Sequence, residues 1–74
     1  MKTELDLHGI KHSDVFQTVD KFIGDHIQRG TREVSIITGF SKNMKNIVNE
    51  VLSDYGATSE DAWMNGGKLI INLS

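Results

Sequence analysis

Apolar residues in this chain switch twice from alternate spacing to helical spacing, and this pattern limits the possible folds more than any other feature. Residues 3–7 alternate between charged and apolar side chains, and residues 33–38 are rich in β-branched side chains, so each segment predicts a strand. An amphipathic helical pattern follows each of them, over residues 13–29 and over residues 42–54. A strand–helix–strand order implies parallel pairing with a right-handed crossover.

Suitable capping residues stand at the ends of both predicted helices. Ser13 and Ser41 are expected N-caps, because a serine hydroxyl can accept a hydrogen bond from an amide of the first helical turn. Gly30 and Gly56 follow the last apolar positions and can take the left-handed conformation that ends many helices.

The last third of the chain predicts an antiparallel hairpin, with strands over residues 60–64 and 68–73 and a turn at residues 65–67. The predicted fold class is α/β, more narrowly an α+β two-layer sandwich of order β-α-β-α-β-β. Two helices cover one face of a four-stranded mixed sheet, and residues 1–74 form a single domain. The predicted core contains Leu5, Leu7, Val19, Phe22, Ile23, Val34, Ile36, Ile47, Val48, Val51, Leu52, Leu69, Ile71 and Leu73.

Size and composition exclude several classes of protein. A chain of 74 residues suits one small domain, and the absence of cysteine excludes disulfides, zinc–thiolate sites and thiol catalysis. The first residues do not resemble a signal peptide, and no apolar run approaches the roughly 20 residues of a membrane span. We therefore expect a cytoplasmic protein without a membrane partner. Because the net charge is −2, any binding to nucleic acid must depend on local positive charge.

The first candidate site lies where the first predicted strand ends. Asp6 and His8 are expected on the open face, at the carboxyl edge of the sheet where α/β proteins bind ligands. Histidine exchanges a proton near pH 7, and a neighbouring carboxylate can orient the imidazole. The alternative is that both residues only end the strand and order the loop.

The second candidate site is the loop between the second strand and the second helix, formed by Thr38, Gly39, Phe40 and Ser41. Gly39 would let the backbone approach a phosphate, and the amides of a helix N-terminus attract anions. Lys42 and Lys45 oppose the helix dipole in the first turn, and residues 34–49 contain no carboxylate. This pattern predicts a phosphate-binding site, whereas the alternative is two solvated lysines. Lys11 and His12 are expected on the neighbouring loop and would add positive charge to the same edge.

Other aromatic residues and histidines allow simpler interpretations. Trp63 is expected to face outward with Ile37 and Ile70, where it could stack on a base, form a dimer interface, or be partly buried at the sheet edge. Phe40 at a loop tip poses the same question. His26 lies at the border of an apolar stripe and is interpreted as a boundary residue without function.

Metal and serine-hydrolase chemistry have little support in the sequence. Glu4, Asp6 and His8 offer alternating ligands, but no second carboxylate cluster completes a site for Mg²⁺ or Zn²⁺. No nucleophile elbow is present. We therefore predict no metal site.

Three motifs together resemble the Smr (small MutS-related) domain family. They are LDLHG at residues 5–9, ITG at residues 37–39 and GG at residues 66–67. The resemblance implies a fold similar to the C-terminal domain of bacterial translation initiation factor three. It also implies nucleic-acid binding, often with DNA-nicking or RNA-cleaving endonuclease activity. It places the site at Asp6, His8, Gly9, Thr38 and Gly39.

Two positions depart from the family pattern. Ser41 stands where the TGxG loop of the family has its second glycine, and Leu69 stands where a glycine usually follows the GG pair. These departures keep more than one interpretation of function open.

The leading hypothesis is an endonuclease, a phosphodiester hydrolase that acts on structured DNA or RNA. His8 would be the general acid or base and Asp6 its orienting partner, and the phosphate would be held by Lys11, Lys42 and Lys45. RNA cleavage would need no cofactor, whereas DNA cleavage would need a divalent metal. The alternatives are a binding module without chemistry and a dimerising interaction domain. The expected oligomeric state is a monomer or a weak homodimer.

Overall fold

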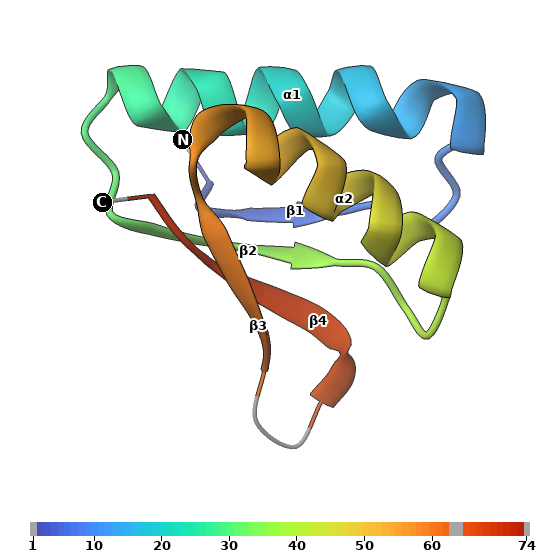
Figure 1. The fold of residues 1–74 in the computed structure, drawn as a ribbon. Coiled ribbons are helices and arrows are strands. Elements are labelled where there is room, and N and C mark those ends of the chain that lie inside the picture. Colours follow the sequence, from blue (N-terminus) through green and yellow to red (C-terminus); the bar gives the residue numbers. More distant parts are fainter. Residues whose placement is uncertain (1, 63–64, 74) are drawn as a thin grey trace.

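The computed structural model describes residues 2–62 and 65–73, and the six elements follow the predicted order β-α-β-α-β-β (Figure 1). They are β1 (Glu4–Asp6), α1 (His12–Gln28), β2 (Glu33–Ile37), α2 (Lys42–Tyr55), β3 (Thr58–Ala62) and β4 (Asn65–Asn72).

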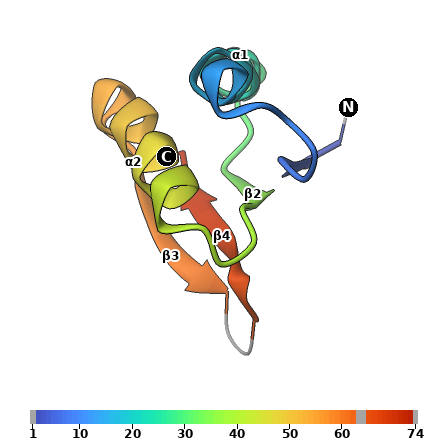
Figure 2. The same ribbon diagram turned by 90° about the vertical axis from the view of Figure 1, so that its right-hand side faces the viewer.

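The strands form one mixed sheet in the order β1-β2-β4-β3. β1 pairs with β2 in parallel, and β4 runs antiparallel to both β2 and β3. Both helices cover the same face of this sheet, which leaves the other face uncovered (Figure 2). The structure therefore confirms the predicted two-layer arrangement, in which strand alternation and helical stripes bury the same side.

The core lies between the helices and the covered face of the sheet. Every predicted core residue belongs to it: ten are buried, and Leu5, Phe22, Ile47 and Leu73 are partly buried and packed against the others. Val15 and Met44 are also buried, because the apolar stripes of α1 and α2 begin within the first turn of each helix. The prediction had omitted these two residues.

The start of α1 differs from the predicted one. The helix begins at His12, and Lys11 takes the N-cap position without a side-chain capping bond, so Ser13 is not the N-cap. The reason is a backbone contact, because the Lys11 carbonyl accepts the Asp14 amide at 2.8 Å and starts the helical ladder early. His12 is therefore a helical residue and not a loop residue.

The predicted hairpin is present, but the start of its first strand and the place of its glycines differ from the prediction. β3 begins at Thr58, because Thr58 and Ser59 already pair with Asn72 and Ile71. Residues 65–67 belong to β4 and do not form the turn, and the pairing shifts register between Asp61 and Ala62. Trp63 and Met64, which were placed in the preceding strand, lie outside the described residues.

His26 is buried and does not lie at a boundary. Its side chain is 1% exposed and contacts the edge of the Phe22 ring, with the ring centroids 4.7 Å apart. Nε2 lies 2.9 Å from the Lys2 carbonyl, and Nδ1 lies 2.9 Å from the Thr31 hydroxyl. Hydrogen bonds at both ring nitrogens allow this polar residue to lie at the end of an apolar stripe.

Candidate functional site

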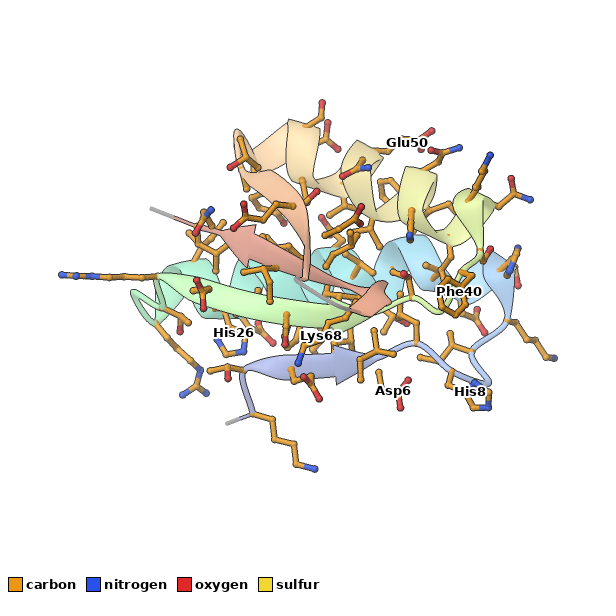
Figure 3. The ribbon with its side chains drawn as sticks, turned by 90° about the horizontal axis from the view of Figure 1, so that it is seen from below. Asp6, His8, His26, Phe40, Glu50 and Lys68 are labelled. Atoms are coloured by element: carbon orange, nitrogen blue, oxygen red, sulfur yellow. The ribbon has the colours of Figure 1, made fainter. Side chains whose placement is uncertain are left out.

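Parallel pairing of β1 and β2 brings the first two motif segments to one edge of the sheet. Asp6 pairs with Ile37, and the Leu7 amide donates to the Ile37 carbonyl at 3.0 Å. The loops that follow the two strands therefore begin side by side. Figure 3 shows Asp6, His8 and Phe40 at this end of the molecule, which we call the carboxyl edge.

Asp6 and His8 are coupled through the backbone. The Oδ1 atom of Asp6 accepts the backbone amide of His8 at 2.9 Å, and both residues are exposed. Gly9 then turns the chain with a φ of 81°, a conformation that glycine adopts without strain. The carboxylate thus orders the turn that carries the imidazole.

The second and third motif segments form one hydrogen-bonded junction. The amides of Thr38 and Gly39 both donate to the Gly67 carbonyl, at 2.8 and 3.0 Å. The Thr38 side chain is buried, and its hydroxyl donates to the Gly39 carbonyl at 2.9 Å. These amides are used within the fold, and contact of Thr38 and Gly39 with phosphate stays a prediction.

Ser41 fits its position without backbone strain. Its φ of −73° and ψ of 115° suit any residue, whereas the left-handed residue of this loop is Gly39, with a φ of 64°. The Ser41 hydroxyl accepts the Met44 amide at 3.2 Å, which confirms the predicted N-cap of α2. The departure from the family glycine therefore replaces backbone freedom with a helix cap.

Lys45 extends the same junction to β3 and β4. Its Nζ donates to the Gly66 carbonyl at 2.6 Å and lies 3.9 Å from Oδ1 of Asp61. Lys42, one turn earlier, is exposed. The two lysines of α2 therefore differ, because Lys45 already contacts the β3–β4 hairpin.

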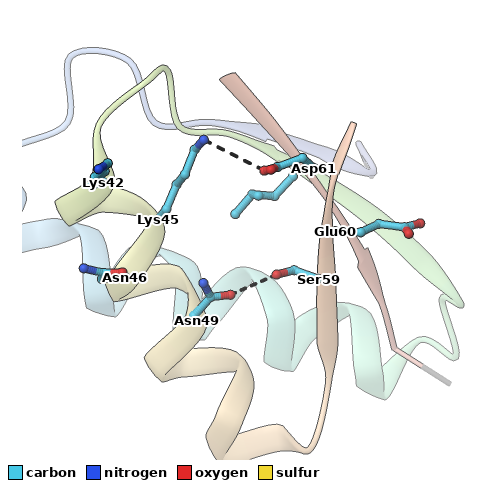
Figure 4. A pocket seen from close by; sticks show the side chains of 8 residues that line it. Lys42, Lys45, Asn46, Asn49, Ser59, Glu60 and Asp61 are labelled. Atoms are coloured by element: carbon cyan, nitrogen blue, oxygen red, sulfur yellow. Dashed lines mark hydrogen bonds and ion pairs between the residues drawn. The ribbon is translucent and has the colours of Figure 1, made fainter. Parts of the chain in front are cut away.

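An open pocket of about 460 Å³ lies between α2 and the covered side of β3 (Figure 4). The Ser59 hydroxyl donates to the Asn49 side-chain oxygen at 2.9 Å on one side of it. Its lining residues are Lys42, Lys45, Asn46, Asn49, Ser59, Glu60, Asp61 and Leu69. Sequence reasoning had missed this pocket, although the four α2 residues recur at a spacing of three and four and could have indicated a polar stripe.

The uncovered face of the sheet is polar and mainly acidic. Lys68 on β4 lies 2.7 Å from Oε2 of Glu4 on β1, and the Ser35 hydroxyl donates to the same oxygen at 3.1 Å. The Lys68 hydrogen bond, followed by that of Ser35, lowers the pKa of Glu4 below its usual value. Sequence reasoning had not singled out Lys68, although strand alternation could have placed it on this face.

The two described residues of the apolar strip expected on this face have polar partners across the sheet. Ile37 pairs with Lys68 and Ile70 pairs with Ser35, so each isoleucine lies opposite a polar residue. Both isoleucines are half-buried, and Trp63 lies outside the described residues. The proposed dimerising role of this strip stays a prediction.

The remaining predicted site residues are exposed around the carboxyl edge. Lys11 ends the loop that follows β1, His12 is the first residue of α1, and both are exposed. Phe40 is 85% exposed at the loop between β2 and α2. The structure thus places Lys11 and Phe40 on the two adjacent loops of this edge and His12 in the first turn of α1.

Residues 2–62 and 65–73 contain neither a candidate metal cluster nor a helix that could span a membrane. No group of three or more His, Cys, Asp or Glu side chains in these ranges could hold a metal ion. Neither helix in them combines the length and apolarity that a membrane span requires.

Comparison with known proteins points to one family. Among solved structures, the fold is similar to that of YdaL, a stand-alone small MutS-related protein from Escherichia coli, with a TM-score of 0.70 and 23% sequence identity. The match covers 96% of this chain, which spans 63% of the YdaL chain. None of the curated proteins matches at a significant level. The Smr domain family matches residues 5–68, well over half of the sequence. The chain therefore belongs to the Smr domain family.

Proposed function

We propose that this Smr domain binds nucleic acid at the carboxyl edge and cleaves a phosphodiester bond there. The observation that carries the proposal is the parallel pairing of β1 and β2, which brings the loop of His8 beside the loop that leads to Lys42. A proton-exchanging group and a cation are thus presented from adjacent loops. These are the groups that phosphate chemistry requires.

The distribution of charge supports binding at this edge. Glu4, Glu33 and Glu60 lie on or border the uncovered face, where Lys68 is paired with Glu4. That face repels phosphates. Residues 34–49, in contrast, contain two lysines and no carboxylate. A polyanion is therefore directed to the loops and to the first turn of α2.

RNA cleavage fits the available side chains. The 2′-hydroxyl attacks the adjacent phosphorus as a base takes its proton, and the bond from phosphorus to the 5′-oxygen breaks as an acid protonates that oxygen. The products are a 2′,3′-cyclic phosphate and a 5′-hydroxyl. His8 and His12 would exchange these protons, and Lys42 would stabilise the charge of the phosphorane.

Asp6 has a positioning role in this proposal. Its carboxylate accepts the His8 amide, so it fixes the backbone from which the imidazole projects. Asp6→Asn keeps an oxygen acceptor for that amide, whereas Asp6→Ala removes it. If positioning is the role of Asp6, the asparagine variant retains most of the activity and the alanine variant loses it.

The test is incubation with labelled structured RNA and branched DNA, with and without EDTA. We expect RNA cleavage to survive EDTA, because the 2′-hydroxyl is the nucleophile. DNA lacks that hydroxyl and needs an activated water, for which a metal is the usual source, so any nicking of DNA should stop. RNA cleavage that EDTA abolishes would contradict the proposed chemistry.

A second candidate is a binding module without chemistry. The observation that favours it is the junction of Thr38 and Gly39 with Gly67, which uses two motif amides inside the fold. This candidate predicts salt-dependent binding of RNA or DNA without cleavage of either. Binding that does not depend on salt would contradict both candidates and favour a protein-interaction domain.

A further inference from the structure

We propose that Phe40 is a stacking platform for one unpaired base, so that the site takes single-stranded or looped nucleic acid and not a continuous duplex. The inference rests on the proposed function and names the substrate class of the same site. Its starting point is exposure: Phe40 is 85% exposed, whereas the other exposed large apolar residues that the structure describes, Phe16, Ile27 and Tyr55, are 38–41% exposed.

The Phe40 ring has a defined support. Its Cε1 atom lies 3.3 Å from the point that a Cβ on Gly66 would occupy, so the ring packs against the bare backbone of β4. The Gly66 carbonyl in turn accepts Lys45 Nζ at 2.6 Å. A Cβ at position 66 would require the ring to shift by a few tenths of an ångström, so glycine here allows the closest contact.

The loop that carries Phe40 is held on both sides. Before it, the amides of Thr38 and Gly39 are bonded to the Gly67 carbonyl. After it, the Ser41 hydroxyl caps α2. A ring on a fixed loop loses little conformational freedom when a ligand binds, which favours binding.

The surroundings of the ring select an anionic aromatic ligand. Lys42, two residues after Phe40, is exposed, whereas Lys45 is bonded to the Gly66 carbonyl and lies 3.9 Å from Asp61, so Lys42 is the cation open to a ligand. A nucleotide supplies both a flat base for the ring and a phosphate for Lys42. A symmetric dimer through Phe40 would instead bring the same lysines of two copies together, and like charges repel.

The interior of a continuous duplex cannot use this platform. Each internal base of a duplex is covered above and below by its neighbours, so a ring at a loop tip reaches a base face only at an unpaired nucleotide or at a duplex end.

The test compares binding of a labelled single-stranded RNA, a hairpin with an unpaired loop and a duplex of the same length with capped ends. Phe40→Ala should weaken binding of the single strand and the hairpin by about fivefold to a hundredfold, the effect of losing one stacked base. Duplex binding should change less than about twofold. Phe40→Trp should keep wild-type affinity, whereas Phe40→Leu, which is apolar but has no π face, should bind like the alanine variant.

Ile27→Ala is the matched control, because Ile27 is an exposed apolar residue at the far end of α1. It should leave all three affinities unchanged, and thermal melting should show that each variant is folded. Equal binding of wild type and Phe40→Ala to the single strand would overturn the stacking role alone. Absence of binding to any RNA by the wild type would overturn the proposed function together with this one. A dimer that Phe40→Ala dissolves would replace stacking with self-association.

Discussion

The two histidines nearest the ends of β1 have opposite environments. His26 is buried beside the amino end of β1, with both ring nitrogens hydrogen-bonded to Lys2 and Thr31. His8 is exposed at the carboxyl edge, where its backbone amide is held by Asp6 (Figure 3). At the amino end of β1 the side chain of His26 is hydrogen-bonded within the fold. At the carboxyl edge the backbone of His8 is hydrogen-bonded, and its side chain is exposed to solvent.

The same division between a hydrogen-bonded backbone and exposed side chains applies to the rest of the carboxyl edge. At the carboxyl edge the amides of Thr38 and Gly39 are bonded to Gly67, while Phe40 and Lys42 remain exposed. A rigid backbone with exposed side chains suits a binding site, because its groups are positioned before a ligand arrives. A buried, fully bonded side chain suits stability. Substitutions at the two ends should therefore separate activity from folding.

The largest expected effect is the loss of cleavage in His8→Ala. If His8 is the acid or base, the rate of RNA cleavage falls by about 10²-fold or more, the usual contribution of general acid–base catalysis. Binding and melting temperature should stay near wild type, because the imidazole is exposed. Single-turnover cleavage and a thermal melt on the same sample measure both. Cleavage at the wild-type rate would remove His8 from the catalytic role and leave the binding module as the better description.

The opposite result is expected for His26→Ala. This change leaves the Lys2 carbonyl and the Thr31 hydroxyl without their partner and opens a cavity beside Phe22, so unfolding becomes easier by about 2 kcal/mol. Urea unfolding followed by circular dichroism measures it. Cleavage per folded molecule should not change. Thr31→Ala is a milder companion, because it removes one of the two hydrogen bonds and should cost about 1 kcal/mol. Equal stability of His26→Ala and wild type would contradict a structural role.

How far the sequence predicts this molecule also differs between the two ends. The element order and the core follow from hydrophobic period, because burial of one face determines both. The edge that gathers Asp6, His8, Gly39 and Lys42 follows from parallel pairing of the first two strands. The environment of His26 did not follow, because one of its hydrogen-bond partners, Lys2, lies 24 residues away in sequence and the other, Thr31, lies beyond the end of α1. The helical stripe alone does not show these two bonds.

Hydrogen bonds between residues that are distant in sequence could not be predicted from the sequence either. Residues 65–67 read as a turn because Asn-Gly-Gly is common there, yet the structure extends β4 through them and uses the carbonyls of Gly66 and Gly67 to bind Lys45 and the Thr38 loop. Turn propensity is local, whereas these hydrogen bonds depend on the register of the whole sheet.

The next largest effect is expected on the salt dependence of nucleic-acid binding. Replacing Lys42 and Lys45 together with alanine should weaken nucleic-acid binding and flatten the slope of log affinity against log salt by up to about 2 units, since each phosphate contact contributes about 0.9. Of the single variants, Lys42→Ala should account for more of this change, because Lys45 is already bonded to the Gly66 carbonyl. Lys21→Ala, which removes one charge on the exposed side of α1, is the control for the single variant Lys42→Ala. An unchanged slope in the double variant would remove this loop from the interface.

A smaller effect is expected at the cap of α2. Ser41→Ala loses the bond to the Met44 amide and should destabilise the domain by about 1 kcal/mol. Ser41→Gly, which restores the glycine of the family, should cost only about a few tenths of a kcal/mol, because glycine is a tolerable N-cap. If the serine is only a cap, RNA cleavage by the glycine variant equals that of wild type. A large gain in cleavage would show that Ser41 restrains the loop.

The smallest effect lies on the uncovered face, between the two ends. Because Lys68 and Ser35 lower the pKa of Glu4, the unfolded chain binds more protons than the folded one in acid. The Glu4 contribution to stability is therefore complete above the ordinary glutamate pKa of about 4.3, and it is lost as pH falls through the lower pKa of the folded state. Lys68→Met should raise the pKa of Glu4 toward the ordinary value, and Ser35→Ala should raise it less, since Lys68 is the larger cause. Titration of the Glu4 carboxyl signal by NMR measures both shifts. An unchanged pKa in Lys68→Met would mean that the 2.7 Å pair does not persist in solution, as is common for exposed ion pairs.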